Sequence, residues 1–458
     1  MTEVDLIIIG GGPGGYETAL SASRAGLRTV LIEAEKLGGT CLNEGCIPTK
    51  CLCRTAEVVE ICKGAEVFGI ECIDVKFDIK KAQERKNQIV EALQSGVLTL
   101  MSSAKVQVIY GWAKFSDRKT VVVENAVTLD GISADSEYTA KNIIIATGSK
   151  PKFLPVAGSG LEGVLTSKEL LSIETIPASL CIIGGGVIGI EFASIFSSFG
   201  SKVSVIEFCK EILPNFDTEL SKRLRLNLKR KGVAFYTGSA VTEIKKVDNR
   251  FSVSYRTGND EDKIEADVVL MAVGRVANTD SLNLQDVGVM TDKRGIVVDE
   301  NFQTSVKGVY AVGDINGICQ LAHAAKFQGQ RVLKAIMGES DSFNFGVIPA
   351  AVFTDPEFAM VGKTENECRT NDIAYKVHKA FFRANGKALA LNSSEGLVKL
   401  ITSSDDKILG CHILGPHASD LIEEVAIVMQ HEGNLDDIRQ TIHAHPTLGE
   451  VVWEAAAE

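Results

Sequence analysis

Two stretches of the chain carry the same pattern of hydrophobic and polar positions. In each stretch, a short β-branched apolar run leads into a glycine-rich turn, a helical pattern follows, and a second apolar run ends on a glutamate. Short runs without polar interruptions are typical of strands buried in a parallel sheet. The pattern covers residues 4–33 and recurs over residues 179–207, so it predicts two α/β units of the kind that binds dinucleotides.

The glycines of both turns stand where a dinucleotide requires them. The first glycine permits a tight turn, the second lets the backbone approach a pyrophosphate, and the third lets helix and strand pack; the glutamate accepts from a ribose hydroxyl. Two copies imply electron transfer from one dinucleotide to another, unless one copy is a relic without ligand. In both copies the glutamate stands 23 positions after the first glycine. The residues are Gly10, Gly12, Gly15 and Glu33 in the first copy, and Gly184, Gly186, Gly189 and Glu207 in the second.

The pattern predicts further elements between and after these units. A long amphipathic helix is expected over residues 77–104, and Pro151 and Pro155 mark a linker. From Pro349 the pattern changes to that of an antiparallel sheet, followed by a helix over residues 418–432. The other expected elements are strands within 142–148, 251–255, 267–275, 308–314, 376–382, 396–401 and 407–414, and a helix over 321–337.

Length and charge narrow the class of protein. A chain of 458 residues suggests about three domains at ~150 residues each. The net charge of −11 argues against nucleic acid or an acidic membrane surface as the main partner. No apolar run approaches the ~18 residues of a membrane span, and the acidic N-terminus enters a strand at once. We therefore expect a cytoplasmic protein, although a mature organellar form without its presequence would look the same.

Cys41 and Cys46 are the first candidate for chemistry. Eleven scattered cysteines in a chain of this length fit a reducing compartment rather than a disulfide-stapled fold. No second Cys or His pair follows at ligand spacing, so no metal site is expected. Two thiols five residues apart, directly after a dinucleotide-binding unit, instead indicate a disulfide that relays two electrons. Lys50 lies four residues beyond Cys46, so both share a face if the segment is helical.

The segment from His443 to Glu450 is the second candidate. Two histidines in this position would by themselves more often be structural or surface residues. With a thiol relay elsewhere in the chain, a histidine backed by a carboxylate would supply the general base that the relay lacks.

Together these motifs resemble the pyridine nucleotide–disulfide oxidoreductases along the whole chain. Residues 38–50 are similar to the family's redox helix, residues 146–148 and 310–314 to its two additional flavin motifs, and residues 445–450 to its C-terminal His–Glu pair. The resemblance implies an α/β fold with two Rossmann-like dinucleotide-binding domains and a C-terminal α+β dimerisation domain. The implied domains are FAD-binding (1–148), NAD-binding (149–270), central and completing the FAD-binding region (271–345), and dimerisation or interface (346–458).

The resemblance also implies roles for single residues. Cys41 would receive the substrate thiolate and Cys46 would pass electrons to the flavin, while Lys50 would pair with Glu191. His445 of one subunit of a homodimer, oriented by Glu450, would complete the disulfide site of the other. The expected residues around FAD and NAD are Gly10, Gly12, Gly15, Glu33, Gly39, Thr40, Lys50, Thr147, Gly148, Gly184, Gly186, Gly189, Glu207, Gly274, Arg275, Gly313, Asp314 (on the ribityl chain), Ala322 and His323.

Finer motifs look more like the dihydrolipoamide dehydrogenase branch than like glutathione reductases, and they lie at 321–325, 354–362, 384–391 and 412–422. Phe208 and Cys209 after Glu207 favour NAD over NADP, and the chain lacks the terminal cysteine pair of mercuric reductases. The implied activity is oxidation of dihydrolipoyl groups, carried by the acyltransferase subunit of a 2-oxoacid dehydrogenase complex or by the glycine cleavage lipoyl protein. One alternative is a related flavin–disulfide reductase. The other is a flavin-bearing scaffold without turnover, and the intact Cys–Cys–His–Glu set argues against that scaffold.

Overall fold

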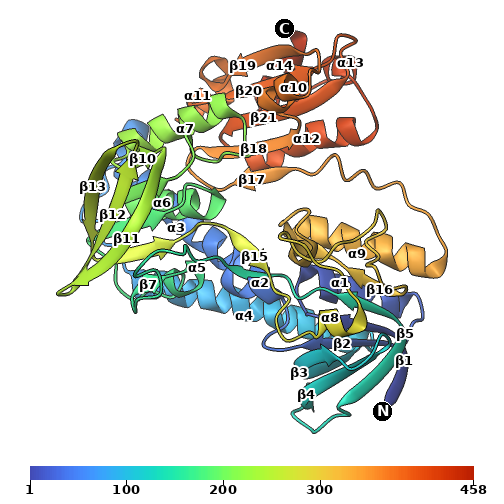
Figure 1. Cartoon of the computed structure of the whole chain (residues 1–458). Helices are drawn as coiled ribbons and strands as arrows, with labels where there is room; N and C mark the ends of the chain where they lie inside the picture. Colours follow the sequence, from blue (N-terminus) through green and yellow to red (C-terminus); the bar gives the residue numbers. More distant parts are fainter. The chain divides into compact units, whose positions relative to one another are not determined.

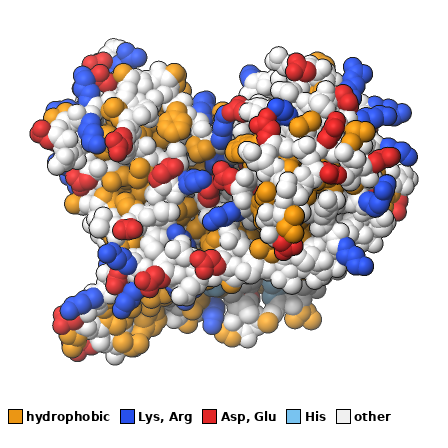
Figure 2. Space-filling view, turned by 90° about the horizontal axis from the view of Figure 1, so that it is seen from below, with side chains coloured by type: hydrophobic (Ala, Val, Ile, Leu, Met, Phe, Trp, Pro, Cys, Tyr) orange, Lys and Arg blue, Asp and Glu red, His pale blue; other side chains and the backbone are white.

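The computed structural model describes all residues from Met1 to Glu458 and divides into two compact units. Unit 1 comprises residues 1–49, 83–152 and 274–343, and unit 2 comprises residues 50–82, 153–273 and 344–458. The expected domain boundaries at residues 148, 270 and 345 stay predictions. No helix combines the length and apolarity that a bilayer crossing requires. Acidic and basic side chains are interspersed over the face of the molecule shown in Figure 2.

Unit 1 is built on a six-stranded sheet (Figure 1). Its parallel strands run in the order β3, β2, β1, β5, β16, and β4 joins β3 to β5 by antiparallel pairing. Helix α9 packs against α1, where a Cβ on Gly329 would lie 1.8 Å from Thr18 Oγ1. The elements are β1 (Thr2–Ile9), α1 (Pro13–Arg24), β2 (Thr29–Glu33), α2 (Gly39–Glu44), β3 (Gln107–Phe115), β4 (Thr120–Thr128), β5 (Glu137–Ile145), β6 (Ser149–Pro151), β15 (Arg275–Ala277), α8 (Leu284–Val287), β16 (Val309–Ala311), η2 (Gly313–Asn316) and α9 (Ala322–Met337).

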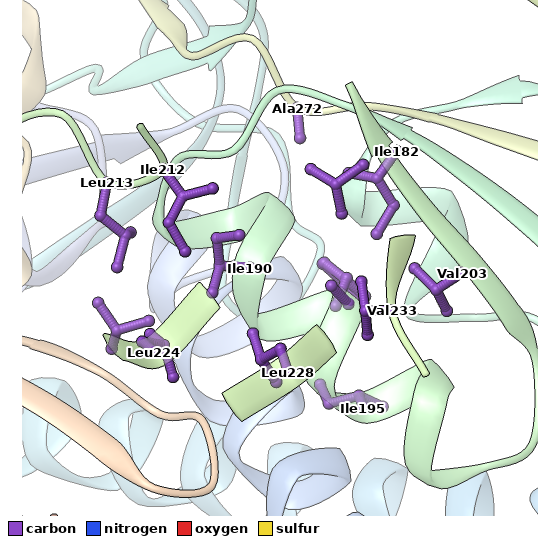
Figure 3. Packing of buried hydrophobic residues seen from close by; sticks show 14 of the residues in the cluster. Ile182, Ile190, Ile195, Val203, Ile212, Leu213, Leu224, Leu228, Val233 and Ala272 are labelled. Carbon is purple, nitrogen blue, oxygen red and sulfur yellow. The ribbon is translucent and has the colours of Figure 1, made fainter. Parts of the chain in front are cut away.

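The first part of unit 2 repeats the strand–turn–helix arrangement in a parallel sheet of order β10, β9, β8, β14, β7. Side chains of β8, α6 and α7 point toward one another in its core (Figure 3). A three-stranded antiparallel sheet, β11–β12–β13, stands beside it. The elements are β7 (Val164–Leu165), α5 (Ser167–Leu170), β8 (Ser179–Ile183), α6 (Val187–Ser198), β9 (Lys202–Glu207), α7 (Thr218–Arg230), β10 (Ala234–Thr237), β11 (Ser239–Val247), β12 (Arg250–Thr257), β13 (Asp260–Ala266) and β14 (Val268–Met271).

The rest of unit 2 is a five-stranded antiparallel sheet of order β17, β18, β21, β20, β19. Helix α12 packs on β18 and β21, and α14 packs on β19 and β20. The elements are β17 (Ala350–Val352), β18 (Glu357–Gly362), α10 (Glu365–Thr370), β19 (Lys376–Phe381), η3 (Phe382–Ala384), α11 (Gly386–Ala390), β20 (Leu397–Thr402), β21 (Ile408–Gly415), α12 (Ala418–Gln430), α13 (Leu435–Arg439) and α14 (Glu450–Ala457); α3 (Cys46–Lys63), η1 (Ala65–Phe68) and α4 (Ile79–Ser103) precede them in the chain. The α/β fold class with two glycine-turn units and an antiparallel C-terminal part is confirmed.

A buried cation joins the antiparallel sheet of unit 2 to helices α7 and α10. Lys399 on β20 is wholly buried, and its Nζ donates to Asp217 Oδ2 at 2.8 Å, to Glu219 at 3.3 Å and to Glu365. Asp217 also caps α7, because its carboxylate accepts from the backbone N–H groups of Glu219 and Leu220. Charged groups buried in this way are stable only while each has its partners.

Lys399 and Glu365 stay ionised at neutral pH, because their pKa values are shifted in favour of the charged forms. Burial alone would lower the pKa of Lys399, but the hydrogen bonds to Asp217 and Glu365 outweigh burial and leave that pKa raised. Burial would raise the pKa of Glu365, but the hydrogen bond from Lys399 leaves it lowered. A raised lysine pKa stabilises the fold below about pH 10.4 and a lowered glutamate pKa stabilises it above about pH 4.3. The stabilisation is therefore complete between these limits and is lost outside them.

We expect Lys399→Met to lower the free energy of unfolding by about 3–5 kcal/mol, because it leaves the buried Asp217 carboxylate without its cation. The matched control is Lys376→Met, since Lys376 is half exposed and pairs with Asp406 at the surface; its loss should be about 0–1 kcal/mol. Urea denaturation at pH 7 measures both. The gap between Lys399→Met and the wild type should shrink as the pH falls below about 4. Equal losses in the two variants would contradict this account.

Candidate functional site

The first glycine turn joins β1 to α1 in unit 1. Gly10 has φ +105°, and a Cβ there would lie 2.4 Å from Ala146 O; a Cβ on Gly15 would lie 1.8 Å from Gly10 O. A Cβ on Gly12 would instead point into a cradle whose nearest atom is Gly39 Cα at 3.8 Å. Gly12 is also the N-cap of α1. The turn therefore presents the start of a helix to an open space, which suits a pyrophosphate.

Glu33 lies at the end of β2 with its carboxylate fixed beside this turn. Its Oε2 accepts from Gly11 N at 2.6 Å and its Oε1 accepts from Glu35 N at 2.8 Å. Burial raises the pKa of Glu33, and these two N–H groups act in the opposite direction. Each carboxylate oxygen has a further lone pair, so the group can still accept from a ribose hydroxyl.

The second turn, between β8 and α6 in unit 2, repeats these contacts. Gly184 has φ +110°, with a Cβ position 2.3 Å from Ala272 O, and a Cβ on Gly189 would lie 2.0 Å from Gly184 O. A Cβ on Gly186 would meet nothing within 4 Å. Glu207 accepts from Gly185 N and, at 2.6 Å, from Cys209 N. The residues present therefore fit two dinucleotides, one in each unit.

The segment with the two cysteines lies directly on the first glycine turn. Gly38 N donates to Gly11 O at 2.8 Å, and a Cβ on Gly39 would lie 2.6 Å from Gly12 Cα. Both Gly38 (φ +100°) and Gly39 (φ +56°) adopt the left-handed region, where glycine carries no steric penalty. Cys41, on α2, is half-buried and Cys46, the first residue of α3, is exposed. The close approach of two backbones thus places the thiols beside a dinucleotide cradle.

Two residues, Asn43 within this segment and Tyr16 beside it, were not singled out from the sequence. Asn43 Nδ2 donates to Leu37 O at 3.1 Å and to Gly39 O at 2.9 Å, which closes the loop before α2. The pKa of Tyr16 is raised to about 12 by burial first, and then by the charges of Glu17 and Cys41. Tyr16 therefore stays a neutral donor on the cysteine side of α1. The role of Asn43 could have been inferred from an asparagine placed within a glycine-rich loop. Nothing in the sequence marked Tyr16.

Three further segments of unit 1 meet at Ser149. Arg275 donates from Nε to Ser149 Oγ at 2.7 Å and from Nη2 to Ser149 O at 2.6 Å, and Ser149 Oγ donates to Asp314. Burial lowers the pKa of Arg275, while Asp314, Glu44 and Cys46 oppose that effect. The expected residues Arg275 and Asp314 are thus brought together through Ser149, which the sequence did not single out.

The start of α9 carries the other expected residues of unit 1. Ala322 and His323 form its first turn, and Gly313 N donates to Gln328 Oε1 at 2.7 Å. Gln328 is wholly buried, and its Nε2 has no hydrogen-bond partner within the chain, so this amide can serve a bound group. Of the remaining predicted residues, Thr40 is exposed on α2, Gly274 O accepts from Lys152 N, and Thr147 and Gly148 are each hydrogen-bonded to Asn278.

Lys50 and Glu191 form an ion pair within unit 2. Lys50 Nζ lies 3.1 Å from Oε1 and 3.2 Å from Oε2 of Glu191. Only 5% of the Glu191 side chain is exposed. Lys50 lies on α3, one turn after Cys46, and Glu191 lies on α6, shortly after the second glycine turn. The pair therefore connects the helix that begins at Cys46 to the helix of the second glycine turn.

His445 and Glu450 form the expected pair at the start of α14. His445 Nδ1 lies 2.9 Å from Glu450 Oε1, and Glu450 Oε2 accepts from Thr447 N at 2.8 Å. The Thr447 N–H first, and His445 second, lower the pKa of Glu450. An ionised carboxylate only accepts, so Nδ1 carries the proton and Nε2 is the nitrogen with a lone pair. His445 is largely exposed, and its Nε2 can act as a base.

A second His–Glu pair supports this loop, although the sequence did not indicate it. His443 is mostly buried; its Nε2 lies 2.7 Å from Glu424 Oε1 and its Nδ1 lies 3.0 Å from Thr441 O. A Cβ on Gly449, which precedes Glu450, would lie 3.7 Å from His443 Cδ2 and 3.9 Å from Glu424 Oε2. Glu424 lies on α12, and nothing in its helical pattern distinguishes it from a surface glutamate.

The comparisons with known proteins agree with this arrangement. The model of the family described as pyridine nucleotide-disulphide oxidoreductase matches residues 4–329, and the model of its dimerisation domain matches residues 348–456. The chain is similar to dihydrolipoyl dehydrogenases of Bacillus subtilis (40% identity; 99% of this chain, 98% of the relative) and Geobacillus stearothermophilus (40%; 99% and 96%), and to the mitochondrial one of Pisum sativum (38%; 99% and 91%).

Among solved structures, the Cu(II) complex of the HOCl-induced flavoprotein disulfide reductase RclA from Escherichia coli is similar over all of this chain and 99% of its own. Its TM-score is 0.88 at 28% identity. Family models cover both the dinucleotide-binding and the C-terminal parts, and the relatives match from end to end. The chain belongs to the pyridine nucleotide-disulphide oxidoreductases and carries their dimerisation domain.

Proposed function

We propose that the protein oxidises dihydrolipoyl groups to lipoyl groups and reduces NAD⁺, with FAD as the internal carrier. One observation carries the proposal: the thiol segment packs on a dinucleotide turn in a chain that is 40% identical, over 99% of its length, to dihydrolipoyl dehydrogenases. Gly10, Gly12, Gly15 and Glu33 would hold FAD. The matching set in unit 2, which ends on Glu207, would hold NAD⁺.

His445 is the base of the proposed reaction. A free thiol has a pKa of about 8.5, so most substrate is protonated at neutral pH and unreactive. His445 would take that proton on Nε2, because Nδ1 is committed to Glu450. The ionised Glu450 carboxylate fixes the orientation of the ring and stabilises the imidazolium that forms.

The two cysteines then exchange one disulfide for another. The substrate thiolate attacks Cys41 Sγ, the Cys41–Cys46 bond breaks, and Cys46 leaves as a thiolate. The second substrate thiol loses its proton to solvent and attacks the substrate sulfur of the mixed disulfide, which forms the lipoyl ring and releases Cys41 as a thiolate. The substrate has lost two electrons and two protons, and the cysteine pair holds the two electrons. Held at the first glycine turn, FAD would supply the two-electron chemistry that links this thiol pair to NAD⁺.

The proposed assembly is a homodimer in which His445 of one subunit serves Cys41 and Cys46 of the other. The match of residues 348–456 to a dimerisation domain supports this proposal. Its macromolecular substrate would be the lipoyl-bearing acyltransferase subunit of a 2-oxoacid dehydrogenase complex, or the lipoyl protein of glycine cleavage. We place the enzyme in the cytoplasm.

Anaerobic mixing of the purified holoprotein with dihydrolipoamide should lower the flavin absorbance within seconds, and added NAD⁺ should then give NADH. Cys46→Ser should abolish both signals, because no disulfide can form. Cys72→Ser is the matched control, since Cys72 is exposed and lies outside the proposed site. If dihydrolipoamide leaves the flavin absorbance unchanged while NADPH lowers it, the proposal is wrong and a reductase of another disulfide is favoured.

The two glycine turns can be tested separately. Gly15→Ala should cost flavin binding and Gly189→Ala should cost NAD⁺ binding while the flavin is kept, because each Cβ would overlap a carbonyl oxygen. Gly96→Ala, on α4 with open space around its Cβ position, should change neither. Flavin content by absorbance and NAD⁺ affinity by calorimetry give the answer. Flavin loss from Gly189→Ala alone would reverse the two assignments.

A mixed dimer tests the shared site. His445→Ala should lower kcat/KM by about 10²–10⁴-fold, the usual contribution of a general base. In a heterodimer of a Cys41→Ser chain and a His445→Ala chain, one of the two sites has both wild-type partners, so about half the wild-type activity should return. Tagged heterodimers purified from co-expression provide the measurement. No recovery in them would rule out a site shared between subunits.

A further inference from the structure

Phe353 contacts both members of the Lys50–Glu191 pair. Its backbone N–H donates to Glu191 Oε1 at 2.9 Å, and its ring centroid lies 4.3 Å from Lys50 Nζ. The sequence analysis expected Glu191 as a partner of Lys50 but did not indicate Phe353. One residue thus holds the anion through its main chain and the cation through its side chain.

The Glu191 carboxylate requires such partners because it is buried. It lies on α6, whose neighbouring residues Ile190 and Phe192 are also buried. An ionised carboxylate in such surroundings is costly unless it is both paired and hydrogen-bonded. Lys50 supplies the charge and Phe353 N–H supplies a fixed donor on Oε1. The carboxylate therefore has a defined position, to which the ammonium of Lys50 is drawn.

The ring acts on the cation itself. A lysine side chain is long and flexible, and about a third of Lys50 remains exposed, so an ion pair alone restrains its ammonium weakly. An aromatic face within about 6 Å attracts a cation and is stronger where water is partly excluded. Glu191 and Phe353 are two separate anchors for one ammonium, and together they limit its rotamers.

The position of Phe353 is set by the strands around it. It follows β17, whose last residue Val352 is wholly buried and pairs with Phe358 of β18. On its other side, Thr354 Oγ1 donates to Pro356 O at 2.6 Å, and Lys231 Nζ donates to Asp355 O at 2.9 Å. The connection between β17 and β18 is thus held at both ends, and the ring with it.

Cys53 and Glu357 are two further titratable groups near the pair. Burial raises the pKa of the Cys53 thiol, the charge of Glu191 raises it further, and Lys50 opposes them. Cys53 therefore stays protonated. Glu357, whose charge also acts on Cys53, has its carboxylate engaged by Ser419 N at 2.9 Å. Glu191 pairs with Lys50 in this cluster.

We propose that Phe353 is a positioning residue that fixes the Lys50 ammonium one helical turn after Cys46, where the cation stabilises the Cys46 thiolate. This rests on the proposed function, in which Cys46 becomes a thiolate when the disulfide opens. Without the ring, Lys50 keeps its charge and its carboxylate but gains rotamers that turn toward water. The thiolate of Cys46 then forms less readily at a given pH.

The test compares Phe353→Leu, which keeps the N–H and the apolar bulk, with Phe353→Tyr, which keeps the ring. In the reduced holoprotein, the rate at which iodoacetamide alkylates Cys46 is followed against pH by mass spectrometry of the peptide. We expect Phe353→Leu to slow alkylation at pH 7 by about three- to tenfold and to move its midpoint to higher pH. Phe353→Tyr should match the wild type.

Phe381→Leu is the matched control. It removes another ring that stacks on a cation, Arg383 at 4.7 Å, away from Lys50, and should leave the Cys46 midpoint unchanged. Should Phe353→Leu lose its flavin, Phe353→Met takes its place. A midpoint that is unchanged in the Leu or Met variant overturns the proposal, whether or not Lys50→Met moves it. Turnover of dihydrolipoamide by the wild type is measured separately, so failure of the proposed function is recognised independently.

Discussion

The structure depends on a close approach between two glycines at the start of each dinucleotide-binding helix. The Cα of Gly15 lies against Gly10 O, and that of Gly189 lies against Gly184 O, with no room for a Cβ in either place. This contact lets α1 and α6 begin directly behind their strands, in turns whose backbone N–H groups at Gly11 and Gly185 also hold the glutamate of the next strand. The thiol segment uses the same device, since Gly39 can lie on Gly12 only because Gly39 carries no side chain.

Much of this arrangement could be predicted from the sequence, because it is local. The amphipathic period gave the long helix as 77–104, and α4 spans Ile79–Ser103; the helix expected over 321–337 is α9, Ala322–Met337. The two glycine turns and the glutamates after them follow from spacing alone. In each case, the residues that determine the element lie within about thirty positions of one another in the chain.

Contacts between distant segments could not be predicted in this way. Ser149 reaches Arg275 across 126 residues, through the short pairing of β6 with β15, and neither strand has a hydrophobic pattern of its own. Lys399 reads as a surface lysine, yet it is wholly buried because three carboxylates from α10 and the start of α7 surround it. His443 and Phe353 are similar cases: their partners Glu424 and Glu191 come from other elements of unit 2.

The connection between β9 and α7 is restrained at both ends. Glu207 is held by Gly185 N, Leu213 N donates to Gly185 O at 2.9 Å, and Asp217 is bonded to Lys399. One residue added or removed here would displace Asp217, the cap of α7, from Lys399. Insertions and deletions in this connection are therefore unfavourable. The exposed turn at Asp248 and Asn249 has no such tether and is where the unit can accept extra chain.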